Sequence, residues 1–180
     1  MRILQKDTAA LLIDIQERLL PVMDRKEELV SQTVKLITGL HILDIPIIPV
    51  RQYPKGLGDL IPEVRAALGE YQPVDKMTFS AWDTAAIAGR AKALGKKNLL
   101  VFGIEAHICV LQTVIDLIAD GYQVILVTDC VSSRRSDDKE IALRRAEQEG
   151  ALLVTAESIL FELLQKAGSD TFKQISQLVK

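Results

Sequence analysis

The sequence predicts a Rossmann-like, three-layer α/β/α fold with a six-stranded, mainly parallel sheet in the strand order 3-2-1-4-5-6. Two observations lead to this prediction. Short runs rich in Val, Ile and Leu alternate with longer segments whose apolar residues recur at helical spacing. The short runs are apolar at nearly every position, which is typical of parallel strands covered by helices on both faces. No linker or repeat interrupts the pattern, so we expect residues 1–180 to form a single domain.

The first half of the chain contains three expected strands. Residues 9–15 (AALLIDI) form the first, and residues 26–43 carry apolar side chains at helical spacing. The apolar residues 45–51 (IPIIPVR) form the second. The two prolines of this segment are tolerated only at the start of a strand or in an edge strand. A loop rich in Gly and Pro leads to a short helix at 61–68 and a weak third strand at 72–76.

The second half repeats the alternation more regularly. Residues 83–94 predict a helix that ends at Gly95, a typical C-cap residue. A strand at 98–102 and a helix at 109–120 follow. The remaining expected elements are a strand at 123–129, a helix at 137–150, a strand at 151–155 and two C-terminal helices.

Composition and charge exclude several kinds of partner. The 22 basic and 24 acidic residues give a net charge of -2, so we expect no nucleic-acid partner. The apolar runs are of strand length, so we expect no membrane insertion. The two cysteines and the absence of a signal-peptide pattern predict a cytoplasmic protein. A small-molecule substrate is the expected partner.

Three chemically suggestive residues fall where such sheets bind ligands, at the carboxyl ends of the strands. Asp14 lies at the end of the first expected strand, Lys76 ends the third, and Cys109 follows the fourth. At the first turn of a helix, the thiol pKa of Cys109 should fall, and a nearby Lys76 ammonium should lower it further. Asp14 could then accept the thiol proton as a general base.

Each of these residues also has a structural interpretation. Free cysteines are often buried packing residues. A carboxylate in an apolar strand needs a partner, and Lys76 could simply neutralise Asp14. Both interpretations place Asp14 and Lys76 together, but the catalytic one also requires Cys109 beside them.

The segments LLIDIQ, DKMTFSAW and VFGIEAHICV together resemble the isochorismatase-like cysteine hydrolase superfamily, which includes nicotinamidases and carbamoyl-amide hydrolases. Together with RQYPKGLG and SSRRSDD, they are most similar to the isochorismatase domain-containing proteins. The resemblance implies that Asp14 is the general base, Lys76 the cation between base and thiolate, and Cys109 the nucleophile. It also implies a cis Ile104-Glu105 peptide, an oxyanion hole formed by the backbone N–H groups of Glu105 and Cys109, and a homo-oligomer.

Departures from the superfamily pattern bear on cofactors. Nicotinamidases carry a metal-binding Asp-x-His where this chain has Arg51-Gln52-Tyr53, and His41 and His107 are its only histidines. We therefore expect no metal and no other cofactor. His107 is a minor candidate for general base because a turn residue two positions from Cys109 need not face the thiol.

Several loop residues at the same edge are expected to contact substrate, with helix packing as the alternative. Ser80 is expected to cap a helix, and Cys130 to be a buried structural thiol. Arg134 or Arg135 could hold an anionic group, but SSRRSDD is first interpreted as a solvated helix start. The expected substrate-binding residues are Gln16, Tyr53, Phe79, Trp82 and Ile108.

The function predicted from these features is metal-independent hydrolysis of a small amide or related carbonyl compound through a Cys109 thioester. Hydrolysis of a vinyl ether, as by isochorismatase itself, is one alternative and needs no thiol nucleophile. A binding or assembly protein with little turnover is another. Nucleotide binding is disfavoured because no G-x-G-x-x-G or Walker-type segment follows any strand.

Overall fold

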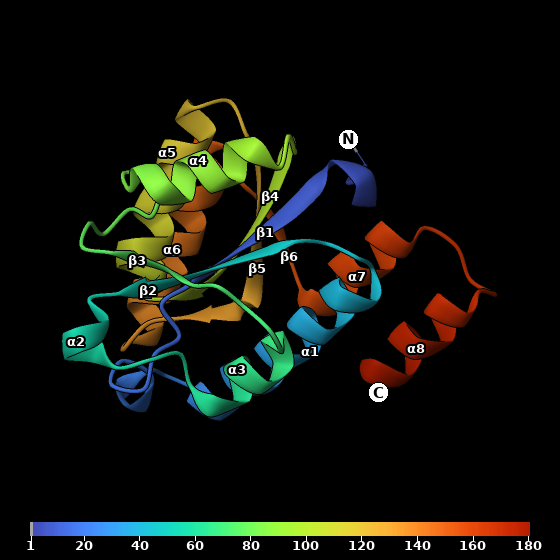
Figure 1. The fold of residues 1–180 in the computed structure, drawn as a ribbon, viewed down its shortest axis with the longest axis horizontal. Coiled ribbons are helices and arrows are strands. Elements are labelled where there is room, and N and C mark those ends of the chain that lie inside the picture. The colour runs from blue at the N-terminus through green and yellow to red at the C-terminus, as the bar shows by residue number, and fades with distance from the viewer. Residues whose placement is uncertain (1) are drawn as a thin grey trace.

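The computed structural model describes residues 2–180 and contains a six-stranded sheet between two layers of helices (Figure 1). The strand order is β3-β2-β1-β4-β5-β6, and each neighbouring pair is parallel. These findings confirm the predicted fold class and strand order. The strands are β1 (Thr8–Ile13), β2 (Ile47–Gln52), β3 (Val74–Lys76), β4 (Asn98–Ile104), β5 (Gln123–Ser132) and β6 (Leu152–Val154).

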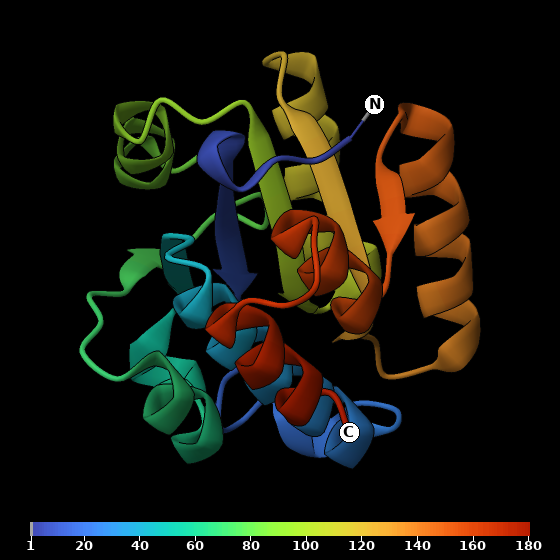
Figure 2. The same ribbon diagram turned by 90° about the vertical axis from the view of Figure 1, so that its right-hand side faces the viewer.

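Helices cover both faces of the sheet, as Figures 1 and 2 show. Helix α1 (Lys26–Ile42) packs with α3 (Pro62–Leu68), α7 (Ala156–Leu164) and α8 (Asp170–Leu178) on one face. The other face carries α4 (Ala85–Ala93), α5 (Leu111–Ala119) and α6 (Ser136–Glu149). Within residues 2–180, no helix has the length and apolar character needed to cross a membrane.

Three local features differ from the sequence predictions. A π-helical turn at Ala106–Val110 precedes α5, so Cys109 lies in that turn and not in the first turn of an α-helix. Helix α4 begins at Ala85, and Ser80 is therefore not its N-cap; the Ser80 hydroxyl instead accepts the Trp82 N–H at 3.2 Å. The loop after β2 contains a short helix, α2 (Pro54–Leu57), which Pro54 favours because its φ is preset for a first helical turn.

The centre of the sheet is formed by β1 and β4, in which every residue is buried. Their side chains pack between the two helix layers, which explains why both strands are apolar at nearly every position after the first. Paired in parallel, β1 and β4 end side by side, with Ile13 opposite Gly103. Polar residues directly after these strands therefore meet at one edge of the sheet.

Gly103 allows the close approach of β1 and β4 at that edge. Its φ is 132°, and a Cβ added there would overlap the backbone carbonyl of Ile13, the residue before Asp14. We expect Gly103→Ala to lower the free energy of unfolding, because backbone strain and overpacking each cost about 1–3 kcal/mol. Urea unfolding measures the loss. Gly89→Ala in α4, where an added Cβ meets nothing within 4 Å, is the matched control and should not destabilise the protein. Equal stability of the two variants would contradict the expectation.

Candidate active site

The structure brings Asp14, Lys76 and Cys109 together at the carboxyl edge of the sheet. Asp14 follows β1 with a positive φ of 54°, Lys76 is the last residue of β3, and Cys109 lies in the turn after β4. Asp14 is 0% exposed, Lys76 3% and Cys109 8%. Side chains from three separate strand ends thus share one buried location.

The Lys76 ammonium links the other two side chains. Its Nζ lies 2.7 Å from Asp14 Oδ2 and 3.5 Å from Cys109 Sγ. It also donates to Gln52 Oε1 at 2.5 Å and to the carbonyl oxygens of Thr78 and Phe79, each at 3.1 Å. An ammonium has three N–H groups, so these acceptors share them and hold Nζ in place.

The Asp14 carboxylate is well suited to accept a proton. Burial raises the pKa of Asp14 from 3.8 to about 6, while the Lys76 charge acts in the opposite direction. Its Oδ1 is buried and has no hydrogen-bond partner among residues 2–180. Because burial penalises the charged carboxylate more than the neutral acid, Asp14 accepts a proton more readily than an exposed aspartate does.

The Cys109 thiol differs from the expectation of a lowered pKa. Burial and then the Asp14 charge raise its pKa to about 12, and the opposing effect of Lys76 is smaller. The prediction was wrong because it weighed the helix dipole and the ammonium but not burial or the neighbouring carboxylate. Asp14 and Cys109 therefore share one negative charge opposite one ammonium, and a thiolate forms when Asp14 takes the proton.

The turn that carries Cys109 is held by the segment after β5. The Ile104-Glu105 peptide is cis, and the Glu105 carbonyl accepts the N–H groups of Ile108 at 3.1 Å and Val110 at 3.2 Å. Arg134 Nε lies 2.9 Å from Glu105 Oε2, and His107 Nδ1 lies 2.9 Å from Ser133 Oγ. Arg134 and His107 therefore already have partners within the protein.

Two of the expected substrate-binding residues, Gln16 and Trp82, make close contacts within the protein. Gln16 is fully buried, and its amide donates to the carbonyls of Gln52 at 2.9 Å and Gly58 at 2.7 Å, so both of its N–H groups are engaged. Trp82 packs edge-to-face on Tyr122, with ring centroids 5.2 Å apart. Both side chains thus have partners within the protein, and their contact with substrate stays a prediction.

The other three expected substrate contacts, Tyr53, Phe79 and Ile108, also stay predictions. Tyr53 and Phe79 are 46% and 57% exposed, and the Phe79 carbonyl binds Lys76. Ile108 is partly buried directly before Cys109. Arg135 pairs at 3.5 Å with Asp137, and both side chains are exposed, as a solvated helix start requires. Cys130 is fully buried.

Gln52 is a site residue that the sequence predictions missed. It ends β2, donates its Nε2 to the Met77 carbonyl at 3.1 Å and accepts the Lys76 ammonium. The rule that selected Asp14 and Lys76, polarity at the end of a parallel strand, also applies to Gln52.

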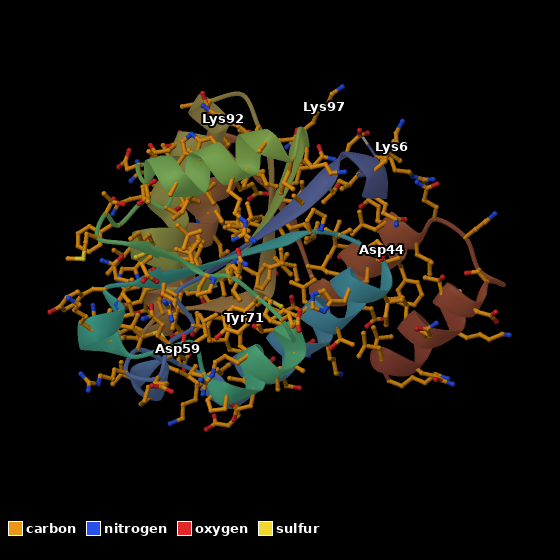
Figure 3. All side chains as sticks on the ribbon, in the orientation of Figure 1. Lys6, Asp44, Asp59, Tyr71, Lys92 and Lys97 are labelled. Atoms are coloured by element: carbon orange, nitrogen blue, oxygen red, sulfur yellow. The ribbon has the colours of Figure 1, made fainter. Side chains whose placement is uncertain are left out.

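The largest cavities described lie away from this cluster. Among residues 2–180, no group of three or more His, Cys, Asp or Glu side chains is arranged to hold a metal ion. The two largest cavities described, about 710 and 610 Å³, are not lined by Asp14, Lys76 or Cys109. The second lies at the amino ends of β4 and β5, where Figure 3 shows Lys92 and Lys97 at the surface.

A Rossmann-like sheet with these groups at its carboxyl edge has the architecture of an isochorismatase-like hydrolase. Residues 8–158 match the isochorismatase domain, and the chain belongs to this family. Isochorismatase domain-containing protein 2 from Danio rerio is 37% identical over 179 residues, which cover 99% of this chain and 89% of that protein.

Two solved structures extend the comparison. A structure described as MAR1 ribonuclease from Caenorhabditis elegans has a TM-score of 0.93 and 36% identity, covering 99% of this chain and 92% of that one. YcaC from Escherichia coli, described as an octameric hydrolase of unknown specificity, has a TM-score of 0.88 and 26% identity. That alignment covers 92% of this chain and 83% of YcaC.

Proposed function

We propose that this protein is a metal-independent cysteine hydrolase that acts on a small amide or related carbonyl compound. The observation that supports this proposal is the buried Lys76 ammonium placed 2.7 Å from Asp14 and 3.5 Å from Cys109. A purely structural ion pair would need Asp14 and Lys76 alone. The thiol beside them adds a nucleophile to a base and a fixed cation.

The proposed reaction begins when Asp14 takes the Cys109 proton and Sγ attacks the carbonyl carbon. The backbone N–H groups of Glu105 and Cys109 would stabilise the oxyanion, each by about 3 kcal/mol. The amine leaves with the proton from Asp14, and a thioester remains. Asp14 then activates a water molecule that releases the acid. The negative charge moves between Asp14 and Cys109 during the reaction, and the Lys76 ammonium stays in place beside both groups.

Alternative functions differ in whether they need the thiol. Vinyl ether hydrolysis does not need a nucleophilic cysteine, and a binding or assembly protein needs no turnover. The Caenorhabditis elegans relative is described as a ribonuclease. Here the net charge of -2 favours a small molecule over a polyanion.

Assembly and location are proposed with the function. We propose a cytoplasmic homo-oligomer, and the octameric Escherichia coli relative supports the oligomer. Light scattering during gel filtration measures the subunit number. A monomer at all concentrations tested would contradict this part of the proposal.

A screen for ammonia release tests the reaction. Small primary amides, ureas and carbamoyl compounds are incubated with wild type, Cys109→Ala and Cys130→Ala, and ammonia is measured. The same proteins are incubated with RNA, and cleavage of the RNA is measured separately. We expect an active amide whose turnover is lost in Cys109→Ala and retained in Cys130→Ala, because Cys130 is buried away from the triad contacts. Amide turnover that survives Cys109→Ala would exclude the thioester route, and RNA cleavage without amide turnover would favour the ribonuclease alternative.

A further inference from the structure

Thr113 makes two buried hydrogen bonds that connect different parts of the candidate site. It lies in α5, one helical turn after Cys109, and is 0% exposed. Its hydroxyl donates to the Cys109 carbonyl at 2.6 Å and accepts the Ala81 N–H at 2.8 Å. The first bond is a common contact of helical threonines. The second comes from a loop that is distant in sequence and has a specific role at the site.

That loop holds the Lys76 ammonium. It follows β3, and its Thr78 and Phe79 carbonyls each accept from Lys76 Nζ at 3.1 Å. Within it, the Thr78 hydroxyl donates to the Ser80 carbonyl at 2.7 Å and lies 3.0 Å from the Thr84 hydroxyl. A loop closed on itself in this way moves as a unit. The Ala81 N–H ties this unit to α5, the helix that directly follows the turn with Cys109.

We propose that Thr113 is a positioning residue that sets the separation of the Lys76 ammonium from the Cys109 sulfur. One hydroxyl joins the loop that holds Lys76 to the backbone of Cys109, and Lys76 Nζ lies 3.5 Å from Cys109 Sγ. This inference rests on the proposed function, because the separation matters only if Cys109 reacts as a thiolate. Without the hydroxyl, the loop and its lysine can move away from Cys109 and Asp14.

A pair of substitutions separates the hydroxyl from the shape of the side chain. Thr113→Val keeps the shape and removes both hydrogen bonds, whereas Thr113→Ser keeps the hydroxyl. Thr38→Val is the matched control, because Thr38 in α1 donates to the Val34 carbonyl at 2.8 Å in the same way. The measurement is the rate of Cys109 alkylation by iodoacetamide, resolved by peptide mass spectrometry between about pH 5 and pH 9.

We expect Thr113→Val to slow alkylation at neutral pH by about tenfold, since one pKa unit of lost thiolate stabilisation is a factor of ten. The midpoint of the pH profile should move upward, because a retreating Lys76 no longer lowers the pKa of Asp14 as strongly. Thr113→Ser and Thr38→Val should keep the wild-type rate and midpoint. If Thr113→Val does not fold, Thr113→Ala, which leaves room for a water at the Ala81 N–H, carries the same expectation.

The outcomes distinguish this inference from the proposed function. A reactive wild-type Cys109 with an unchanged rate in Thr113→Val would overturn the inference alone. A slower rate with an unchanged midpoint would also overturn it, since it would indicate general loosening of packing. A wild-type Cys109 no more reactive than a model thiol at every pH would overturn the proposed function and the inference together.

Discussion

Lys76→Met should lower the free energy of unfolding at about pH 8 by about 3–5 kcal/mol, because it leaves the buried Asp14 carboxylate without its cation. Both side chains are 0% exposed, so water cannot replace the lost partner. Urea unfolding measures the loss. Lys173→Met, which breaks the exposed pair with Asp170, is the control and should leave the stability unchanged.

The stability lost in Lys76→Met should increase as pH rises. The folded-state pKa of Asp14 is raised from 3.8 to about 6, so stability from this group is lost as pH rises between these values. Without Lys76 the pKa rises further, and the loss extends to higher pH. The penalty of Lys76→Met should therefore be small at about pH 5 and grow above about pH 6.

The double variant Asp14→Asn/Lys76→Met provides a second check. It removes the uncompensated charge and should recover part of the stability that Lys76→Met loses at about pH 8. Additive losses from the two substitutions would show that Asp14 and Lys76 do not stabilise one another. A pH-independent penalty for Lys76→Met would lead to the same conclusion.

Asp14→Asn should reduce kcat by about 10² to 10⁴, the usual contribution of a positioned general acid and base. An amide cannot accept the Cys109 proton or return it to the leaving amine. The variant should fold, because Lys76 keeps Gln52 and the Thr78 and Phe79 carbonyls as partners. Steady-state assays with the active amide measure the loss.

The same substitution should change the pH profile of Cys109 alkylation. In wild type, the state in which Asp14 and Cys109 share one negative charge forms as pH rises through the Asp14 pKa of about 6. The rate should rise to that point and then level off. In Asp14→Asn the rise in alkylation rate should occur at higher pH, because burial still raises the pKa of the Cys109 thiol. If the midpoint of the alkylation profile is the same in Asp14→Asn and wild type, a group other than Asp14 controls the rise in rate.

The sequence predicted the sheet and the position of the triad because both depend on simple regularities. Continuous apolar runs such as those of β1 and β4 occur when helices cover both faces of a parallel sheet. Polar residues that end such strands must meet at one edge, which brought Asp14 and Lys76 together. Gln52 follows the same rule and could have been included.

The electrostatics and local contacts were not predictable in the same way. The pKa of Cys109 depends on burial and on its distance to Asp14, which apolar periodicity does not specify. The contacts of Gln16 with Gly58 and of Trp82 with Tyr122 join loops whose conformations have no repeating pattern. The bond from Ala81 to Thr113 likewise depends on how a loop after β3 meets α5.

The most direct test of the proposed cysteine mechanism is a search for the covalent intermediate on Cys109. Wild type and Asp14→Asn are mixed with the active amide, quenched in acid and analysed by peptide mass spectrometry, with hydroxylamine added in a parallel sample. We expect the Cys109 peptide to gain the mass of the substrate minus its amine, and hydroxylamine to divert the product to a hydroxamate. Amide turnover with an unmodified Cys109 peptide and no hydroxamate would contradict the thioester mechanism.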